Sequence, residues 1–472
     1  MGSIGPAAVE LDTTLRDLYA IDNPDVDDLV LVYAIPSPAM AMTENLPLST
    51  TFPVQGPRIK VLSRDSLART CLLTGPESYA FATGNMPLVL FNIDPTEYDH
   101  LDAKDQPTPN PGWQAQGQRV FDALRPDQRP RLSFVSKPSE IEVTPRTKLV
   151  VLHPMDCLAH LPHAIDPKLH YELQSKPGLA LSGLPTPPTE LIAPELRADQ
   201  AGDEGALDAE VERMLRPVRE RALPFVVKMP QACAGQGVFV VRSETDRQEV
   251  LEVFPPEVKK MLQQLYAGDQ DPKTASLVLQ DCVASSTVDS LNLFVTKSGR
   301  PIFLGRGAQY LDARGQWGGN FISYANQDDY RVRYAGLLET LASVLHARGY
   351  YGPVGIDVMQ DADGQPYIVD LNPRVTASYQ LSLLRGHFYE RRGLSEAVLF
   401  YPLGLKCTRE TFDDVFRAEI TAGRVVVCGW CEGRAGPGGV FRYSTVSLVL
   451  GGKNAADLQQ LVDKVNAFKI YK

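Results

Sequence analysis

Residues 355–374 constrain the fold of this chain more than any other stretch, because they predict a two-stranded hairpin with charged groups inside apolar strands. An apolar strand around Asp357 leads into the turn Asp-Ala-Asp-Gly at 361–364, and the strand around Asp370 returns. A carboxylate inside an apolar strand needs a partner or a metal ion, because burying an unpaired charge costs free energy. The hairpin therefore predicts a polar site built on a sheet.

The polar groups of this hairpin suit a magnesium ion and its nucleotide. Asp370 and Asn372 are two residues apart and share one face of the returning strand, and Asp357 can lie across the hairpin from them. Carboxylate and amide oxygens are hard ligands that Mg²⁺ takes together with phosphate oxygens, and Arg374 follows one step beyond. A surface hairpin with hydrated acids is the alternative interpretation.

The composition predicts an ordinary globular protein. The chain has 472 residues, of which 44% are hydrophobic, enough for two to four domains. Its formal charge of -10 argues against a general binder of nucleic acid or of anionic membranes. The chain lacks a long apolar run and a signal pattern at its amino terminus, which favours a cytoplasmic protein without a membrane segment.

Cysteines and histidines predict no separate chemistry. The seven cysteines are odd in number and scattered, as expected for reduced thiols. Cys428 and Cys431 have the spacing of a redox pair, but the Gly-rich residues after them cannot form the helix that activates such a thiol. Redox or metal use stays the minor alternative. His160, His163 and His170 lack the spacing of a zinc site and are interpreted as structural.

Apolar strands and helical segments divide the chain into three expected domains. Residues 1–160 carry short apolar runs between Pro-rich loops and predict a leading α/β domain. Residues 161–405 contain the hairpin and a second predicted hairpin at 288–304. Residues 406–472, with two apolar strands and a helix, predict a small C-terminal α+β domain. The expected fold class is multidomain, α/β and α+β.

Lys228 and a Gly-rich turn form a second polar group, ahead of the hairpin. Lys228 lies in the apolar strand 225–229, where a buried ammonium is costly without an anion. The turn at 232–237 is small and Gly-rich, so backbone N–H groups can approach phosphate oxygens. A Walker loop would instead run into a helix with Gly-Lys-Ser/Thr. A plain hairpin with one snorkelling lysine is the alternative.

A third signal is a buried strand at 277–283 that breaks off into a polar turn. Its backbone groups can serve an adenine edge, with a polar side chain available for the amino group of the base. An ordinary core strand is the alternative interpretation.

The three signals follow one another in the order seen in the ATP-grasp superfamily, which this chain resembles from about residue 166 to residue 405. The sequence Asp-Leu-Asn-Pro-Arg at 370–374 is the most specific part of the resemblance. It implies an ATP-grasp fold for residues 161–405, ATP as cofactor, and one or two Mg²⁺ ions with Mn²⁺ as the alternative. It also implies an ATP-dependent carboxylate–amine ligase, which forms an amide or peptide bond through an acylphosphate and releases ADP and phosphate.

The resemblance also implies roles for single residues. Lys228 would bind the α- and β-phosphates, with Lys168 as the earlier nucleotide lysine and Lys176 as its rival. Arg374 would contact the reactive phosphoryl group. The other implied groups are a phosphate flap of Ala234, Gly235, Gln236 and Gly237, an adenine hinge of Gln280, Asp281 and Val283, a ribose contact at Asp289, and metal ligands at Asp357, Asp370 and Asn372.

Two further residues concern the substrates. Arg306 follows a predicted strand and is the candidate for binding the substrate carboxylate, with a surface arginine as the alternative. The Gly-rich segment 315–323 is a candidate lining of the acceptor pocket, although core packing of Trp317 explains it equally well.

Two departures from the superfamily pattern stand out. The second acid of the hairpin is usually Glu, so Asp370 has a shorter reach, and Gly355 stands where some carboxylate ligases carry Arg. The alternatives to a ligase are a non-catalytic ATP-binding regulatory protein and a biotin-carboxylase-like enzyme, the latter without a biotin-attachment motif in this chain. Expected partners are ATP and a small-molecule carboxylate and amine, without nucleic acid or membrane, and a homodimer is left open.

Overall fold

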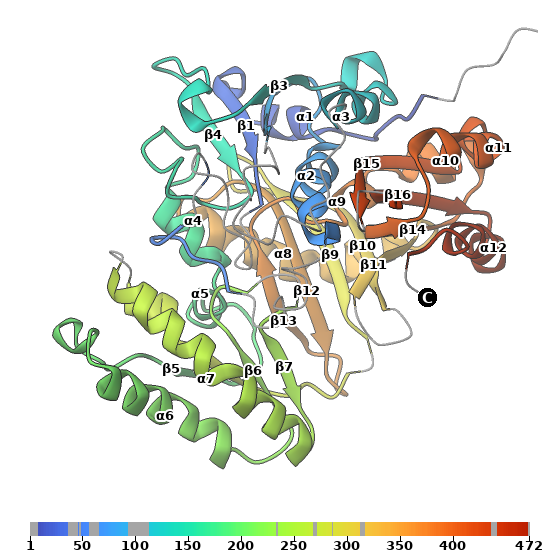
Figure 1. Ribbon diagram of the computed structural model, residues 1–472. Helices are drawn as coiled ribbons and strands as arrows, with labels where there is room; N and C mark the ends of the chain where they lie inside the picture. Colours follow the sequence, from blue (N-terminus) through green and yellow to red (C-terminus); the bar gives the residue numbers. More distant parts are fainter. Residues whose placement is uncertain are drawn as a thin grey trace, which may run out of the picture.

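The computed structural model describes residues 8–35, 46, 49–55, 66–92, 113–232, 235–267, 271–285, 287–311, 317–435 and 441–470. Within these residues the chain forms three β-sheets with helices packed against them (Figure 1). This mixture of parallel and antiparallel sheets confirms the expected fold class. No helix in the described ranges has both the length and the apolar character needed to cross a membrane.

The first sheet is parallel, with strand order β3-β2-β1-β4. Three of its strands are short apolar runs, as expected where a parallel sheet is covered on both faces. The strands are β1 Leu29–Tyr33, β2 Pro87–Phe91, β3 Arg131–Val135 and β4 Lys148–Val151, and the helices of this region are α1 Leu15–Ala20, α2 Ser66–Ala80 and α3 Trp113–Asp122.

The second sheet is antiparallel, with strand order β5-β8-β6-β7. Its strands are β5 Thr189–Ile192, β6 Phe225–Lys228, β7 Val238–Val241 and β8 Leu277–Asp281. Two helices, α6 Glu204–Glu220 and α7 Glu244–Ala267, share an apolar core with one face of the sheet (Figure 1). Along β6, Phe225 and Val227 point into that core, so Val226 and Lys228 lie on the opposite face.

The third sheet has eight strands in the order β13-β12-β9-β10-β11-β14-β16-β15, and every described pairing is antiparallel. Its strands are β9 Asp289–Val295, β10 Pro301–Leu311, β11 Trp317–Ser323, β12 Gly352–Gln360, β13 Pro366–Asn372, β14 Glu396–Leu405, β15 Val425–Ala435 and β16 Phe441–Gly452. The associated helices are α8 Gln327–Ala347, α9 Tyr379–Ser382, a π-helix Gly386–Glu390, α10 Arg409–Val415, α11 Arg417–Thr421 and α12 Ala455–Asn466.

The third sheet runs without a break across residue 405, because β14 pairs with β11 on one side and with β16 on the other. The strands expected in a separate C-terminal domain therefore extend the same sheet. The domain boundaries at 160 and 405 remain predictions.

The hairpin of β12 and β13 lies at the edge of the third sheet, next to the second sheet (Figure 1). Ile356 and Val358 pack in an apolar core with α8, so Asp357 lies on the other face of β12. Lys228 Nζ donates a hydrogen bond to the carbonyl oxygen of Val369 at 2.7 Å. The polar faces of the two sheets therefore meet at the hairpin.

Two short helices pack against strand β13 of this hairpin. They are α4 Pro167–Gln174 and α5 Lys176–Ala180, and the side chains of Asp166 and Ser175 cap their amino ends.

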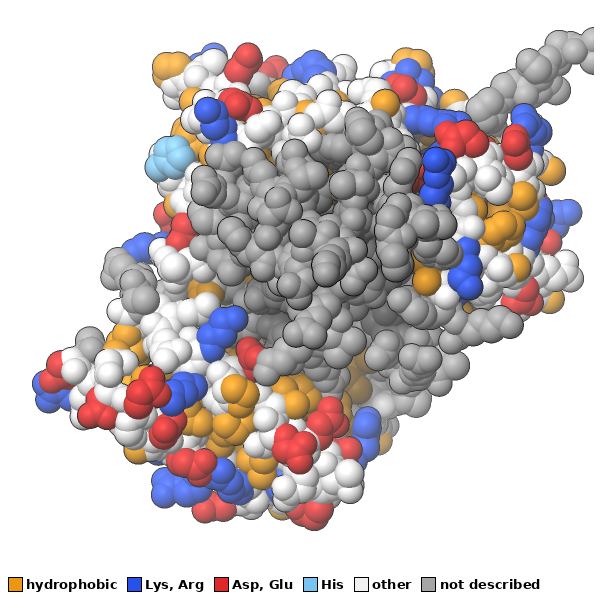
Figure 2. Space-filling model, in the orientation of Figure 1, with side chains coloured by type: hydrophobic (Ala, Val, Ile, Leu, Met, Phe, Trp, Pro, Cys, Tyr) orange, Lys and Arg blue, Asp and Glu red, His pale blue; other side chains and the backbone are white. Residues whose placement is uncertain are grey.

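On the visible surface of the second sheet's helices, acidic and basic side chains alternate (Figure 2). Lys259 on α7, for example, pairs with Asp208 on α6 at 2.7 Å.

Candidate active site

The two acids of the hairpin lie directly opposite each other. Asp357 and Asp370 are register partners in β12 and β13, and the register shifts just after Asp357. The hydroxyl of Ser290 donates to Asp357 Oδ1 at 2.7 Å, and Gln309 Nε2 donates to Asp357 Oδ2 at 3.3 Å. Asn372 Nδ2 donates to Asp370 Oδ2 at 3.2 Å. The structure therefore brings Asp357, Asp370 and Asn372 together, as the sequence predicts.

Two lysines approach these acids from the neighbouring elements. Lys176, the first residue of α5, forms an ion pair with Asp370 Oδ1 and is only 7% exposed. Its backbone N–H donates to the carbonyl oxygen of Pro230 at 2.9 Å, which ties α5 to the end of β6. Lys228, on β6, is 5% exposed. Both ammonium groups therefore lie between the sheets, beside the hairpin acids.

Burial and charge act differently on the two acids. Burial, and after it the neighbouring negative charge of Asp370, raises the pKa of Asp357 to about 6. Burial also opposes ionisation of Asp370, but Lys176 and then Lys228 outweigh it and hold the pKa of Asp370 below its usual value. Burial lowers the pKa of Lys228 to about 8, although Asp370 opposes this shift. Asp357 is thus a half-buried acid whose ionised form lacks full compensation by protein cations.

This donor set fits a magnesium ion. Asp357 and Asp370 offer carboxylate oxygens and Asn372 offers an amide oxygen, which are hard ligands for Mg²⁺. The raised pKa of Asp357 shows that another positive charge beside it would be favourable. No cluster of three or more His, Cys, Asp or Glu residues suited to a metal occurs among the described residues. A site with two acids and one amide is compatible with that finding, because phosphate oxygens and water would complete it.

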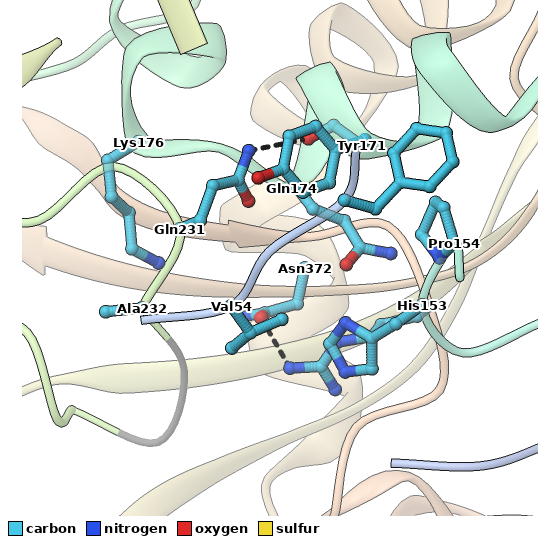
Figure 3. Close-up of a pocket in the computed structure, with 11 residues that line it drawn as sticks. Val54, His153, Pro154, Tyr171, Gln174, Lys176, Gln231, Ala232 and Asn372 are labelled. Carbon is cyan, nitrogen blue, oxygen red and sulfur yellow. Dashed lines mark hydrogen bonds between the residues drawn. The ribbon is translucent and has the colours of Figure 1, made fainter. Parts of the chain in front are cut away.

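A pocket opens beside the acids, between the loop after β4, α4 and the end of β13. Figure 3 shows Lys176 and Ala232 on one side of it, His153 and Pro154 on the other, and Asn372 between them. The lining residues are Phe52, Val54, His153, Pro154, Tyr171, Gln174, Lys176, Gln231, Ala232, Asn372 and Arg374. The wall is thus partly apolar, and its charged groups are cations.

Arg374 lines this pocket next to the predicted metal ligands. Its Nη2 donates to Asn372 Oδ1 at 3.0 Å and its Nη1 to the carbonyl oxygen of Val375 at 3.1 Å. Within the part of the chain that the structure describes, no carboxylate forms an ion pair with Arg374. The guanidinium therefore keeps N–H groups for an anion in the pocket.

Of the two candidate nucleotide lysines, the geometry favours Lys176. Lys168 is exposed on α4, whereas His170, Tyr171 and Leu173 form the buried face of that helix. Lys176 follows the cap at Ser175 and points inward. The nucleotide contacts of both lysines remain predictions.

The geometry gives no support to the roles predicted for Asp289 and Arg306. Arg306 Nε donates to Asp289 at 2.9 Å, and the hydroxyl of Tyr334 on α8 donates to Asp289 at 2.5 Å. Asp289 shares its face of β9 with Leu291, which packs against α8, whereas Ser290 faces Asp357. Both residues thus lie on the α8 side of the sheet and satisfy each other, so neither enters the proposed site.

The residues of the predicted adenine hinge lie at the end of β8. Gln280 Nε2 donates to the hydroxyl of Thr189 at 2.9 Å, and exposed Asp281 pairs with Arg221 at 2.6 Å. Val283 is half-buried in the turn that follows. Their adenine contacts remain predictions.

The predicted phosphate flap is described only in part. Ala234 lies outside the described residues, whereas Gly235 has a φ of +72°, which favours glycine. The carbonyl oxygen of Gly237 accepts a hydrogen bond from Met229 N at 2.8 Å, and Gln236 lies between Gly235 and Gly237 in the turn. The segment predicted to line the acceptor pocket, 315–323, begins outside the described residues. The side chain of Trp317 also lies outside what the structure describes.

His153, Gln174 and Gln231 line the pocket but were not singled out from the sequence. One signal could have drawn attention to His153, which follows β4 in a parallel sheet, because ligands often bind at the carboxyl ends of such strands. Gln174 and Gln231 have no comparable signal.

Cys428 and Cys431 are both buried in strand β15. A strand lacks the helix amino end that activates a redox pair, and burial raises the pKa of the Cys428 thiol. This geometry gives no support to the minor alternative of redox use.

Two sheets thus meet at a site of carboxylates and lysines, as the resemblance to the ATP-grasp superfamily implies. Residues 208–372, about a third of the chain, match the family model described as L-aspartate--L-methionine ligase, ATP grasp. The match confirms the resemblance drawn from the sequence, and this part of the chain is an ATP-grasp domain of the ligase type. Its general activity is ATP-dependent carboxylate–amine ligation.

Solved structures give more distant likenesses. An L-amino acid ligase from Bacillus licheniformis is 11% identical, with 94% of this chain and 99% of that chain covered and a TM-score of 0.46. An N5-carboxyaminoimidazole synthetase from Staphylococcus aureus, complexed with ADP, is 10% identical, with 93% and 96% covered and a TM-score of 0.45. No curated protein sequence matches this chain. Likenesses at this level do not decide the substrate.

Proposed function

We propose that this protein joins a carboxylate to an amine through an acylphosphate, with ATP as the phosphoryl donor and ADP and phosphate as products. One observation carries the proposal: Lys176 and Lys228 meet Asp357, Asp370 and Asn372 between two sheets. Phosphoryl transfer needs positioning and charge neutralisation more than it needs a protein nucleophile. A cluster of cations and metal-type ligands supplies those two requirements.

The two lysines would bind the phosphates of ATP. They now contact Asp370 and the carbonyl oxygen of Val369, which are both on the hairpin. Phosphate oxygens entering between the sheets would give each ammonium a stronger partner than a carbonyl oxygen. The flap at 235–237 and the hinge at Gln280 and Val283 would hold the rest of the nucleotide.

Asp357, Asp370 and Asn372 would hold Mg²⁺ at the hairpin. The ion would neutralise negative charge on the phosphates and orient the transferred group. Arg374 follows Asn372 by two residues and turns its free N–H groups to the pocket, where a phosphoryl group leaving ATP would find a bidentate cation.

The family description suggests the first substrates to test, L-aspartate as the carboxylate and L-methionine as the amine. The purified protein would be incubated with ATP and Mg²⁺, with each amino acid alone and with both. We expect ADP release and a dipeptide mass only when a carboxylate and an amine are both present. If this pair gives no product, the same assay is run with pooled amino acids and carboxylic acids.

Asp370→Asn is the matched variant for this assay, because it keeps the size of the side chain and removes its charge. We expect ADP release to fall to background in Asp370→Asn. Full turnover in Asp370→Asn would exclude the metal assignment. ATP binding without ADP release, for every acid and amine in the pools, would favour a regulatory ATP-binding protein instead of a ligase.

A further inference from the structure

A histidine from the first sheet faces the pocket where the proposed reaction takes place. His153 follows β4, and its ring points into the pocket beside the amide of Gln174 (Figure 3). Arg374 lines the same pocket, and its positive charge acts on His153. A residue from the amino-terminal part of the chain therefore meets the group assigned to the reactive phosphoryl.

Gln174 controls which ring nitrogen of His153 is free. Its Nε2 donates to the carbonyl oxygen of Leu152 at 2.8 Å and also contacts His170 Nε2 at 2.8 Å. With its nitrogen engaged, Gln174 has its oxygen left for His153, and this hydrogen bond favours the protonated ring. A neutral imidazole has one N–H and one lone pair. The N–H therefore goes to Gln174, and the second ring nitrogen keeps its lone pair.

The proposed reaction needs a proton acceptor at this place. An α-amino group has a pKa of about 8 in a peptide, so most amine molecules are protonated at neutral pH. A proton must also leave the nitrogen as it bonds to a carbonyl carbon. Two other polar groups near this place are already engaged and are not available as that acceptor. Asp370 is paired with Lys176, and the hydroxyl of Tyr171 donates to the carbonyl oxygen of Pro53.

We propose that His153 accepts the proton that the ammonium form of the amine must lose before its nitrogen attacks the acylphosphate. The amine nitrogen bonds to the carbonyl carbon, and the bond between that carbon and the phosphate oxygen breaks, with its electron pair staying on phosphate. The ammonium proton passes first to the free ring nitrogen of His153 and from there to solvent, and the second N–H proton leaves with the released phosphate. This inference rests on the proposed ligase function.

The charges around His153 agree with this role. Burial lowers the pKa of His153 well below its usual value, and the charges of Arg374 and His170 add to the shift. The ring is therefore uncharged before the reaction. An acylphosphate bound at Arg374 would bring negative charge close to the ring and raise its pKa. His153 would thus become a stronger base only after the acid has been activated.

Hydroxylamine separates this role from a structural one. It is uncharged at neutral pH, and it converts an acylphosphate to a hydroxamate without needing a base. Wild type and His153→Gln would be compared at pH 7 with ATP, Mg²⁺ and L-aspartate, using either L-methionine or hydroxylamine as the acceptor. His160→Gln, which changes an exposed histidine of the same region, is the matched control.

We expect His153→Gln to lower amide formation at least about 100-fold while hydroxamate formation stays close to wild type. Amide formation by the variant should recover as pH rises, since more amine is then unprotonated. Wild-type amide formation in His153→Gln, or an equal loss of both products, would overturn the proposal. If wild type forms neither product with L-aspartate or with pooled acids, the ligase function itself fails, which is a distinct result.

Discussion

Lys168 and Lys176 lie on consecutive helices, and only Lys176 reaches the hairpin. Both follow a helix-capping residue closely, so local sequence cannot separate them. The distinction arises from packing, because α4 buries His170 and Tyr171 and turns Lys168 to solvent. At the scale of one residue, the position of a charged side chain is set by which face of its helix packs against the core.

We therefore expect Lys176→Met to weaken ATP binding and Lys168→Met to leave it nearly unchanged. A charged hydrogen bond contributes about 1.5–3 kcal/mol, so the dissociation constant should rise roughly 10- to 150-fold in Lys176→Met. Calorimetric titration with ATP and Mg²⁺ would measure both variants. Equal effects of the two substitutions would show that Lys176 does not bind the nucleotide.

Arg374 should act on the reaction rate more than on nucleotide binding. Its N–H groups face the pocket, where charge develops as the phosphoryl group is transferred. We expect Arg374→Ala to lower kcat strongly and to change the ATP dissociation constant little. Steady-state rates and calorimetry on the same preparation would test this. A change confined to the KM for ATP would contradict the assignment.

Glu77 gives a prediction for pH and stability. It is fully buried on α2, accepts a hydrogen bond from Trp430 N at 3.1 Å, and has its pKa raised by burial to about 8. The folded state therefore keeps this proton at pH values where the unfolded chain has lost it. The free energy of unfolding should fall as pH rises from about 4.5 to about 8.

Glu77→Gln should remove this part of the pH dependence, because the amide does not ionise. We expect the variant to gain stability over wild type progressively across that window, by up to roughly 5 kcal/mol. Urea unfolding of both proteins at several pH values would measure the difference. The exposed Glu410→Gln is the control, and a constant difference at all pH values would contradict the assignment of Glu77.

At the scale of elements, a close contact in the hairpin region explains why glycine stands at position 355, where some carboxylate ligases carry arginine. A Cβ atom at this position would overlap Cγ2 of Thr376. An arginine of the kind that some carboxylate ligases carry there would meet the same obstacle. The glycine is therefore required by the chain segment that folds over β12 after the hairpin.

This contact predicts a coupled pair of substitutions. Gly355→Ala should lower the free energy of unfolding by about 1–3 kcal/mol, since overpacking forces the backbone or Thr376 to shift. Thr376→Ser removes Cγ2 but keeps the hydroxyl that donates to Asn292 Oδ1 at 2.7 Å. The double variant should therefore recover most of the loss. Additive effects in a double-mutant cycle would rule out the proposed overlap.

Elements with a local signal could be predicted from the sequence, and their mutual positions could not. The strand with Lys228, the hairpin at Asp357 and the hairpin that became β9 and β10 all follow from apolar runs and turn residues. The side of the sheet that Asp289 takes depends on the pairing of β9 with β12, where Ser290 is opposite Asp357. That pairing joins distant parts of the chain, so no local pattern reveals it.

At the scale of the whole molecule, residues 49–55 connect the first sheet to the ATP-grasp domain. Asp156, which follows β4, accepts hydrogen bonds from the backbone N–H groups of Thr50 at 2.8 Å and Thr51 at 2.9 Å. At the other end, Tyr171 donates to the carbonyl oxygen of Pro53 at 2.7 Å, and Gln55 N donates to Gln231 O at 3.1 Å. The segment is thus held from both sides.

This connection places Phe52 and Val54 in the pocket wall, so loosening it should affect the substrates and spare the nucleotide. We expect Asp156→Ala to raise the KM for the amine about tenfold, because its carboxylate no longer orders the segment, with the ATP dissociation constant unchanged. Asp156→Asn keeps one acceptor oxygen, so its KM for the amine should lie between the values for Asp156→Ala and wild type. Tyr171→Phe, which frees the other end, should act in the same direction. Equal changes in ATP affinity and amine KM would mean that Asp156 supports the general fold and does not shape the pocket.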